Sequence, residues 1–220
     1  MIICYEPPGP EALATARAAL VRLDPALEPL EAALPPFAWR LRPAGFHGLA
    51  KMIVEQQVSV ASAAAIWGRL EAGLGEVSGR AVLARAPEEF APFGLSRPKI
   101  RYVRALAEAE ADGRIDFEAL RDLPDDEAIA VLTALIGVGR WTAETYLMFC
   151  EGRLDVFPGG DVALQEAMRW ADRAQARPDE KAAYARAERW RPYRGVAAHL
   201  LWGCYGAVRR GEIVLAGPEG

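Results

Sequence analysis

Apolar residues recur at helical spacing along most of this chain, and this pattern constrains its fold more than any other feature. Leu13, Ala16, Leu20 and Leu23, for example, share one face of a helix over residues 11–23. Strand-like patterns occur only at residues 2–5 and 213–215. Alanine, the strongest helix former, supplies 42 of the 220 residues. We therefore predict an all-α fold of about ten helices.

Prolines, glycines and capping residues divide the helical pattern into segments. The pattern over residues 46–74 is interrupted near residues 56–59, where Ser59 is placed to cap a second helix. The proline-rich residues 34–43 read as a loop. The other predicted helices span residues 87–93, 97–112, 117–123, 141–150, 161–170, 181–190 and 195–210, with one more starting at Pro124.

These segments suit a single unit, residues 1–220, made of two helical subdomains with an active-site cleft between them. We expect one lobe over residues 45–155. The second, terminal lobe is expected to combine residues 1–44 with residues 156–220. The chain is long enough to bury a sizeable core in such an arrangement.

Composition excludes several classes of protein. The formal net charge is −4, so DNA binding would need a local basic or dipolar surface. Three widely separated cysteines exclude an iron–sulfur cluster held by four thiolates, and His47 and His199 are too far apart in sequence to suggest a metal site. No apolar run reaches membrane-spanning length, and the N-terminus lacks a signal-peptide pattern. We expect a cytoplasmic, nucleoid-associated monomer without a cofactor.

The segment LTALIGVGRWTAETYLMF, residues 132–149, predicts two helices joined by a tight turn at residues 136–139. Gly137 and Gly139 both permit backbone conformations that a Cβ disfavours. Backbone N–H groups at the start of the second helix would suit a phosphate, with Arg140 as an added cation. Such donors hold DNA without reading its sequence. Taken alone, the motif also fits an ordinary corner between two helices.

Asp161 is a second signal, because it follows Pro-Gly-Gly and precedes an apolar helix. Its common role at such a position is to cap the helix. A capping carboxylate that faces a cleft can also serve chemistry, and the sequence alone leaves both readings open.

The hairpin followed by DVFPGGD at residues 155–161 resembles the helix-hairpin-helix DNA glycosylase superfamily, and most closely its bacterial 3-methyladenine DNA glycosylase II branch, which acts on alkylated purines. Three further blocks match that branch: IVEQQVSVASAAAIWGRL (53–70), AERWRPYRG (187–195) and HLLWGCYG (199–206). The resemblance covers residues 40 to 206, approximately.

The resemblance implies roles for individual residues. Asp161 would be the catalytic aspartate. The phosphate-gripping hairpin would comprise Gly137, Val138 and Gly139, with a monovalent cation at the backbone of Ile136 and Val138. Gln56 and Gln57 fall where the family inserts a wedge into the DNA stack. Gln57 replaces an apolar residue that is frequent there.

The base pocket implied by the resemblance contains Trp141 and Trp202, with Thr145 and Tyr146 beside them. Plain core packing is the alternative for both tryptophans. The branch has a tyrosine at the position of Thr145, so this pocket wall would be more open or more polar. Trp39 and Phe46 are further candidates for the same cleft. The nearby arginines 186, 189, 191 and 194 form either a solvated face or a contact to the DNA backbone.

Trp141 also bears on the reaction type, because lyase branches of the superfamily have a Schiff-base lysine at this position. A tryptophan cannot act as that nucleophile. The implied function is hydrolysis of the N-glycosidic bond of alkylated bases, such as 3-methyladenine and 7-methylguanine, in double-stranded DNA after base flipping. The alternatives are a monofunctional glycosylase for another damaged or mismatched base, and a non-catalytic helix-hairpin-helix DNA-binding module.

Overall fold

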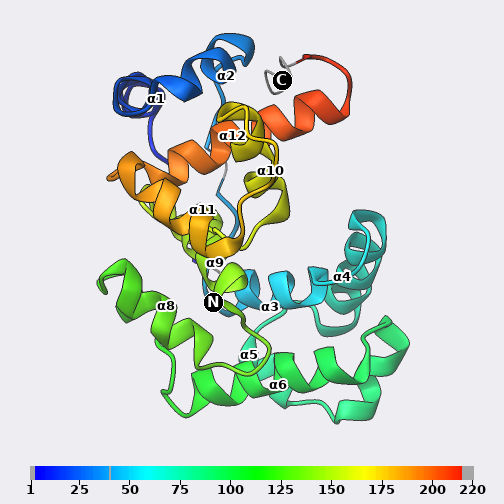
Figure 1. Ribbon diagram of the computed structural model, residues 1–220. Coiled ribbons are helices and arrows are strands. Elements are labelled where there is room, and N and C mark those ends of the chain that lie inside the picture. Colours follow the sequence, from blue (N-terminus) through cyan, green and yellow to red (C-terminus); the bar gives the residue numbers. More distant parts are fainter. Residues whose placement is uncertain (1–2, 40, 215–220) are drawn as a thin grey trace. The chain divides into compact units, whose positions relative to one another are not determined.

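The structure, a computed structural model, describes residues 3–39 and 41–214, and these are built of helices (Figure 1). No strand occurs in these ranges, which confirms the predicted all-α class. The strand-like residues 2–5 contribute one isolated antiparallel bridge, between Ile3 and Ala44, and residues 213 and 214 form no regular element. Ile2 and Leu215 lie outside the described residues. No helix within the described ranges is long and apolar enough to span a membrane.

The chain divides into two compact units. The first contains residues 3–5 and 41–151, and the second contains residues 6–39 and 152–214, as far as each is described. Residues 3–5 therefore leave the terminal lobe in which they were predicted. The cause is local contact: Ala44 N donates to Ile3 O at 2.7 Å, and the Arg121 guanidinium lies 3.7 Å from the centre of the Tyr5 ring.

The first unit is assembled around α3, which packs against α4, α6 and α9 and is buried along most of its length. Large apolar side chains such as Leu49 and Ile53 are fully buried there. The helices of this unit are α3 (Gly45–Glu55), α4 (Val60–Leu74), α5 (Gly79–Leu83), the 3₁₀-helix η2 (Pro87–Phe93), α6 (Arg97–Ala111), α7 (Phe117–Leu120), α8 (Asp125–Thr133) and α9 (Arg140–Glu151).

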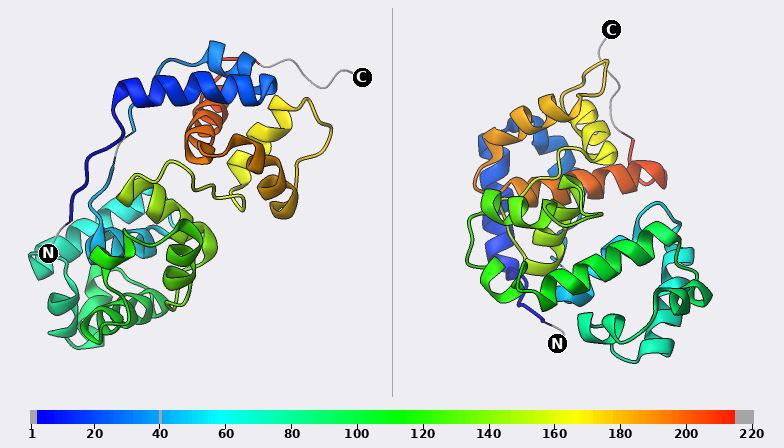
Figure 2. Two further views of the ribbon diagram at one scale, coloured as in Figure 1. Left: turned by 90° about the vertical axis from the view of Figure 1, so that its left-hand side faces the viewer. Right: turned by 90° about the horizontal axis from the view of Figure 1, so that it is seen from below.

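The second unit is assembled around α12, which packs against α1, α2 and α10. Figures 1 and 2 show the blue N-terminal helices beside the orange-to-red α12, although the two lie far apart in sequence. The helices of this unit are α1 (Pro10–Leu23), η1 (Pro25–Leu27), α2 (Glu28–Ala33), α10 (Val162–Ala171), α11 (Glu180–Ala187), η3 (Glu188–Trp190) and α12 (Arg194–Arg209).

Asp24 joins the two sequence segments of the second unit. Its side chain is buried, and Oδ2 accepts hydrogen bonds from Trp190 Nε1 at 2.7 Å and from Arg186. Burial raises the pKa of Asp24, but the hydrogen bonds from Arg186 and Trp190 outweigh it and lower the pKa overall. The buried carboxylate is thereby kept charged and paired, which a buried charge requires.

Candidate functional site

The predicted helical hairpin is present in the first unit, with α8 ending at Thr133 and α9 beginning at Arg140. Gly137 has φ +87°, and a Cβ there would lie 2.4 Å from a ring carbon of Tyr102. Gly139 does not have a positive φ, so of the two glycines only Gly137 uses a backbone conformation that a Cβ disfavours. A Cβ on Gly139 would meet no atom within 4 Å. Gly139 thus leaves open space beside the backbone.

The start of α9 is a helix N-terminus beside that space. The helical ladder begins with Ala143 N donating to Gly139 O at 3.0 Å, and the first N–H groups of a helix have no acceptor within the helix itself. Val138 N instead donates to Leu135 O within the turn, at 3.1 Å. A helix N-terminus of this kind favours an anion.

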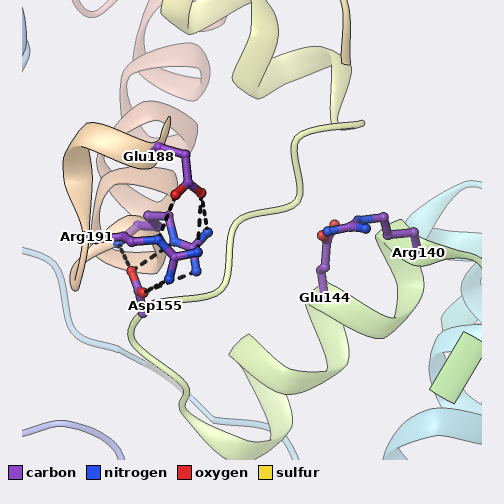
Figure 3. A network of polar contacts seen from close by, with 6 residues as sticks. Arg140, Glu144, Asp155, Glu188 and Arg191 are labelled. Atoms are coloured by element: carbon purple, nitrogen blue, oxygen red, sulfur yellow. Dashed lines mark hydrogen bonds and ion pairs between the residues drawn. The ribbon is translucent and has the colours of Figure 1, made fainter. Parts of the chain in front are cut away.

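Arg140, predicted as a DNA-contacting cation, is anchored on its own helix. Its Nε donates to Glu144 Oε1 at 2.9 Å, and the Glu144 side chain is only 1% exposed (Figure 3). The guanidinium is about half exposed. Its charge is therefore held beside the turn by a buried carboxylate one helical turn further on.

The predicted monovalent cation at the backbone of Ile136 and Val138 stays a prediction. Backbone carbonyl oxygens suit such an ion. The carbonyl between them, that of Gly137, accepts a hydrogen bond from the side chain of Gln56. Within the described residues no cluster of three or more His, Cys, Asp or Glu side chains could hold a metal ion.

The two glutamines at the break between α3 and α4 have different environments. Gln56 is half-buried, and its Nε2 donates to Gly137 O at 3.1 Å and to Thr142 Oγ1 at 3.2 Å. Gln57 is exposed and has φ +55°, a left-handed conformation. Ser59 caps α4 as predicted, its Oγ accepting from Ser62 N at 3.2 Å. Of the two glutamines, only Gln57 is thus exposed to solvent, as a wedge residue would be.

Exposed large apolar side chains of the first unit gather on this tip and on the hairpin. Within the described residues they are Val58, Val60, Ile136 and Trp141, which are 38%, 89%, 57% and 45% exposed. We call these four residues and Gln57 the apolar tip surface. Its exposure favours the pocket reading of Trp141 over core packing. The exposure of Val58, Val60 and Ile136 was not predicted from the sequence, although Val58 directly follows the two glutamines.

Thr145 and Tyr146, predicted beside the base pocket, are both buried in the first unit. The Thr145 hydroxyl donates back to Trp141 O at 2.8 Å within its own helix. The Tyr146 hydroxyl accepts a hydrogen bond from Gly45 N at 2.8 Å, and its ring contacts Phe117. Burial raises the pKa of Tyr146 well above its usual value. These contacts give both residues packing roles, so neither is retained in the proposed pocket.

Asp161, in the second unit, is the N-cap of α10. Its Oδ1 accepts from Ala163 N at 2.9 Å and from Leu164 N at 3.0 Å. Trp202 on α12 donates its indole Nε1 to the same oxygen at 3.2 Å. The carboxylate is therefore half-buried, fixed by two helices and in contact with the tryptophan predicted as its pocket neighbour.

The Trp202 ring also belongs to a small aromatic cluster of the second unit. His199 meets the Trp202 ring edge-on at 6.0 Å, and Trp39 lies 4.2 Å from His199, measured between ring centroids. Trp39 and, in the first unit, Phe46 are each 2% exposed, so both pack in cores and do not line an open cleft. The structure thus keeps only Trp141 and Trp202 as aromatic site candidates.

The arginine cluster before α12 is neither a free solvated face nor an open phosphate site. Asp155 pairs with Arg191 and Arg194, and Glu188 pairs with the same two arginines (Figure 3). Arg186 pairs with Asp24 and with Asp172. Three of the four arginines therefore form ion pairs within the second unit. Their role there is structural.

Comparison with known proteins agrees with this arrangement. Residues 50–192 match the family model described as HhH-GPD superfamily base excision DNA repair protein. A DNA-3-methyladenine glycosidase structure from Bacillus halodurans is similar, with 32% identity, a TM-score of 0.80 and coverage of 89% of this chain and 91% of that one. The Schizosaccharomyces pombe 3-methyladenine DNA glycosylase in complex with abasic DNA has 26% identity and a TM-score of 0.73, covering 86% and 95%.

Curated relatives extend the same comparison. DNA-3-methyladenine glycosylase 1 of Schizosaccharomyces pombe is 34% identical over 110 residues, covering 50% of this chain and 48% of the relative. The chain spans about half the length of the first curated relatives it matches, between 48% and 58%. The family match nevertheless extends over most of this chain, and the matched region includes both the hairpin and Asp161. The chain therefore belongs to the HhH-GPD superfamily of base excision DNA repair proteins.

Proposed function

We propose that this protein is a monofunctional DNA N-glycosylase that removes alkylated bases, such as 3-methyladenine and 7-methylguanine, from double-stranded DNA. One observation carries the proposal: an aspartate at a helix N-cap is fixed by two backbone N–H groups and by an indole N–H. The names of the similar proteins given above support the choice of substrate. We expect it to act as a monomer, and the substrate would place the protein at the nucleoid.

The chemistry asked of Asp161 follows from the substrate. Alkylation at N3 or N7 gives a purine positive charge and makes it a good leaving group, so little acid catalysis is needed. The sugar becomes cationic as the bond breaks. A fixed carboxylate stabilises that cation and serves as the base for the attacking water. The hydrogen bonds to Oδ1 hold the group in place before the reaction.

Aromatic side chains would select the base. Trp141 and Trp202 offer ring faces to a flipped, cationic purine, and each cation–π contact contributes about 0.5–2 kcal/mol. Such energies give modest selectivity, which supports a broad range of alkylated substrates. Trp141 also stands where a lyase would need its lysine, and the nearby Lys99 is committed to Val54 O at 2.7 Å. We therefore assign base release by hydrolysis without strand cleavage.

The first unit would hold the DNA. The open backbone at Gly139 and the start of α9 would bind a phosphate, while the exposed tip, residues 57–60, would enter the stack where a nucleotide is flipped out. The second unit would supply Asp161. This division predicts that binding and base release can be separated by mutation.

Asp161→Asn tests the proposal. Asparagine caps a helix about as well as aspartate, so thermal stability should be nearly unchanged. The charge and the basicity are lost, so single-turnover excision of 3-methyladenine should fall by at least about 10²–10³-fold. Affinity for lesion DNA should be retained or slightly tightened, because the carboxylate no longer repels phosphates.

Asp116→Asn is a matched control, because Asp116 caps α7 through two N–H groups in the same pattern. It should excise at the wild-type rate. Near-normal excision by Asp161→Asn would reduce Asp161 to a helix cap. Activity of the wild type on mismatched or oxidised bases only would point to a glycosylase of another specificity, and binding without any base release would point to a DNA-binding module.

A further inference from the structure

Gln56 connects two DNA-contacting elements that are far apart in sequence. It ends α3, and its side-chain amide reaches 81 residues along the chain to Gly137 O and 86 residues to Thr142 Oγ1. These acceptors lie in the hairpin turn and in the first turn of α9. A primary amide nitrogen carries two hydrogens, so both donors of Gln56 are used.

The same end of α3 is held a second time through α6. Lys99 Nζ donates to Val54 O at 2.7 Å, and Tyr102 on the same helix packs against Gly137. Burial lowers the pKa of Lys99, as expected for an ammonium group used inside the fold. α3, α6 and the hairpin are therefore tied together at one point.

Gln57 follows immediately and depends on this anchoring. Its left-handed conformation is unfavourable for a residue with a Cβ, so neighbouring contacts must maintain it. The residue before it is fixed by Gln56, and the residues after it are fixed by the Ser59 cap of α4. The direction in which Gln57 leaves the surface is thus set between these two anchors.

We propose that Gln56 is a positioning residue that holds the tip, residues 57–60, in fixed register with the phosphate-binding hairpin. A duplex gripped at Gly139 would then meet the tip at one defined base step, and phosphate binding would be coupled to entry into the stack. The inference rests on the proposed DNA-binding site. It adds that Gln56 itself is not part of the wedge, although it was predicted as one.

The test uses Gln56→Met, which preserves length and removes both donors. The probe is a duplex with a tetrahydrofuran abasic-site analogue beside 2-aminopurine, whose fluorescence rises when the stack is opened. Gln56→Met should bind an undamaged duplex within about twofold of wild type, because the hairpin backbone is intact. Its fluorescence rise should be about tenfold slower, because the tip is out of register.

A double-mutant cycle separates positioning from direct contact. Gln57→Ala should also slow the rise, and the two changes together should slow it by clearly less than the product of their separate effects, since Gln56 acts through the tip that carries Gln57. Arg69→Met, which removes a side-chain hydrogen bond to Phe93 O elsewhere in the same unit, should match wild type. Thermal melts of all variants verify that each is folded.

Two results would overturn the inference. Additive effects of the two glutamine changes would make Gln56 an independent DNA contact. If Gln56→Met lost affinity for the undamaged duplex by as large a factor as it slowed the fluorescence rise, Gln56 would only support the hairpin. Failure of the proposed DNA-binding site is distinct from both, because the wild type itself would then bind neither duplex.

Discussion

At the scale of single residues, His199 has an environment that determines a response to pH. Its ring stacks on Phe37, with centroids 5.1 Å apart, and lies 4.2 Å from the Trp39 ring centroid. Burial among these rings lowers the pKa of His199 from 6.5 to about 4. The folded protein therefore keeps this imidazole neutral at pH values where an unfolded chain would protonate it.

This difference predicts a loss of stability on acidification. Between pH 6.5 and pH 4 the unfolded state binds more protons at His199 than the folded state, so the free energy of unfolding falls as pH falls through this window. The full effect is of the order of 3 kcal/mol, and it is complete below pH 4. Denaturant unfolding at pH 7 and at pH 5 measures the part of this stability loss that falls between those two pH values.

His199→Phe removes the titration and retains a ring for stacking. The loss of stability between pH 7 and pH 5 should be clearly smaller in this variant than in wild type. Some loss should remain, because burial, together with the charge of Lys51, also lowers the pKa of His47. Identical pH dependence in both proteins would mean that His199 does not carry the effect.

At the scale of elements, the two hairpin glycines serve different ends, and a pair of alanine variants separates them. Gly137→Ala should destabilise the fold, because a Cβ there is strained at φ +87° and meets the Tyr102 ring. Gly139→Ala should leave thermal stability nearly unchanged, since its Cβ enters open space. That space is where the phosphate would sit, so affinity should fall by a similar factor for lesion and undamaged duplexes.

Thermal melts and duplex titrations of both variants check this prediction. A Gly139→Ala protein that binds undamaged DNA normally would show that no phosphate approaches this backbone. A selective loss for lesion DNA would instead indicate that the turn contacts the damaged base.

The elements that could be predicted from sequence are those whose cause is local. Ser59 and Asp161 cap helices as predicted, because capping depends on residues two or three positions away. α5 was missed, since five residues are too few to show a helical period. The role of Gln56 depends on a partner 81 residues away, which no local pattern reveals. The ion pair between Arg186 and Asp24 could not be predicted for the same reason, because the two residues are 162 positions apart in sequence.

At the scale of the whole molecule, charge constrains how the protein can hold DNA. The net charge is −4, and within the described residues ten arginines pair with carboxylates. Their positive charges are largely balanced where they stand. The proposed grip relies on backbone N–H groups at the start of α9 and on an apolar tip. Both contribute affinity without releasing many counterions from the DNA.

The salt dependence of binding should therefore be shallow. A protein that neutralises six to ten phosphates with free cations gives a slope of log affinity against log salt of about −5 to −9. Because the proposed grip uses backbone N–H groups and apolar side chains, we expect a slope of about −3 or shallower for an undamaged duplex. Titrations between low and physiological salt, at constant pH and temperature, give this slope directly. Arg189→Ala, a change in the arginine cluster of the second unit, should leave the slope as it is. A slope near that of a strongly basic protein would mean that an arginine surface, and not the hairpin backbone, provides most of the grip on DNA.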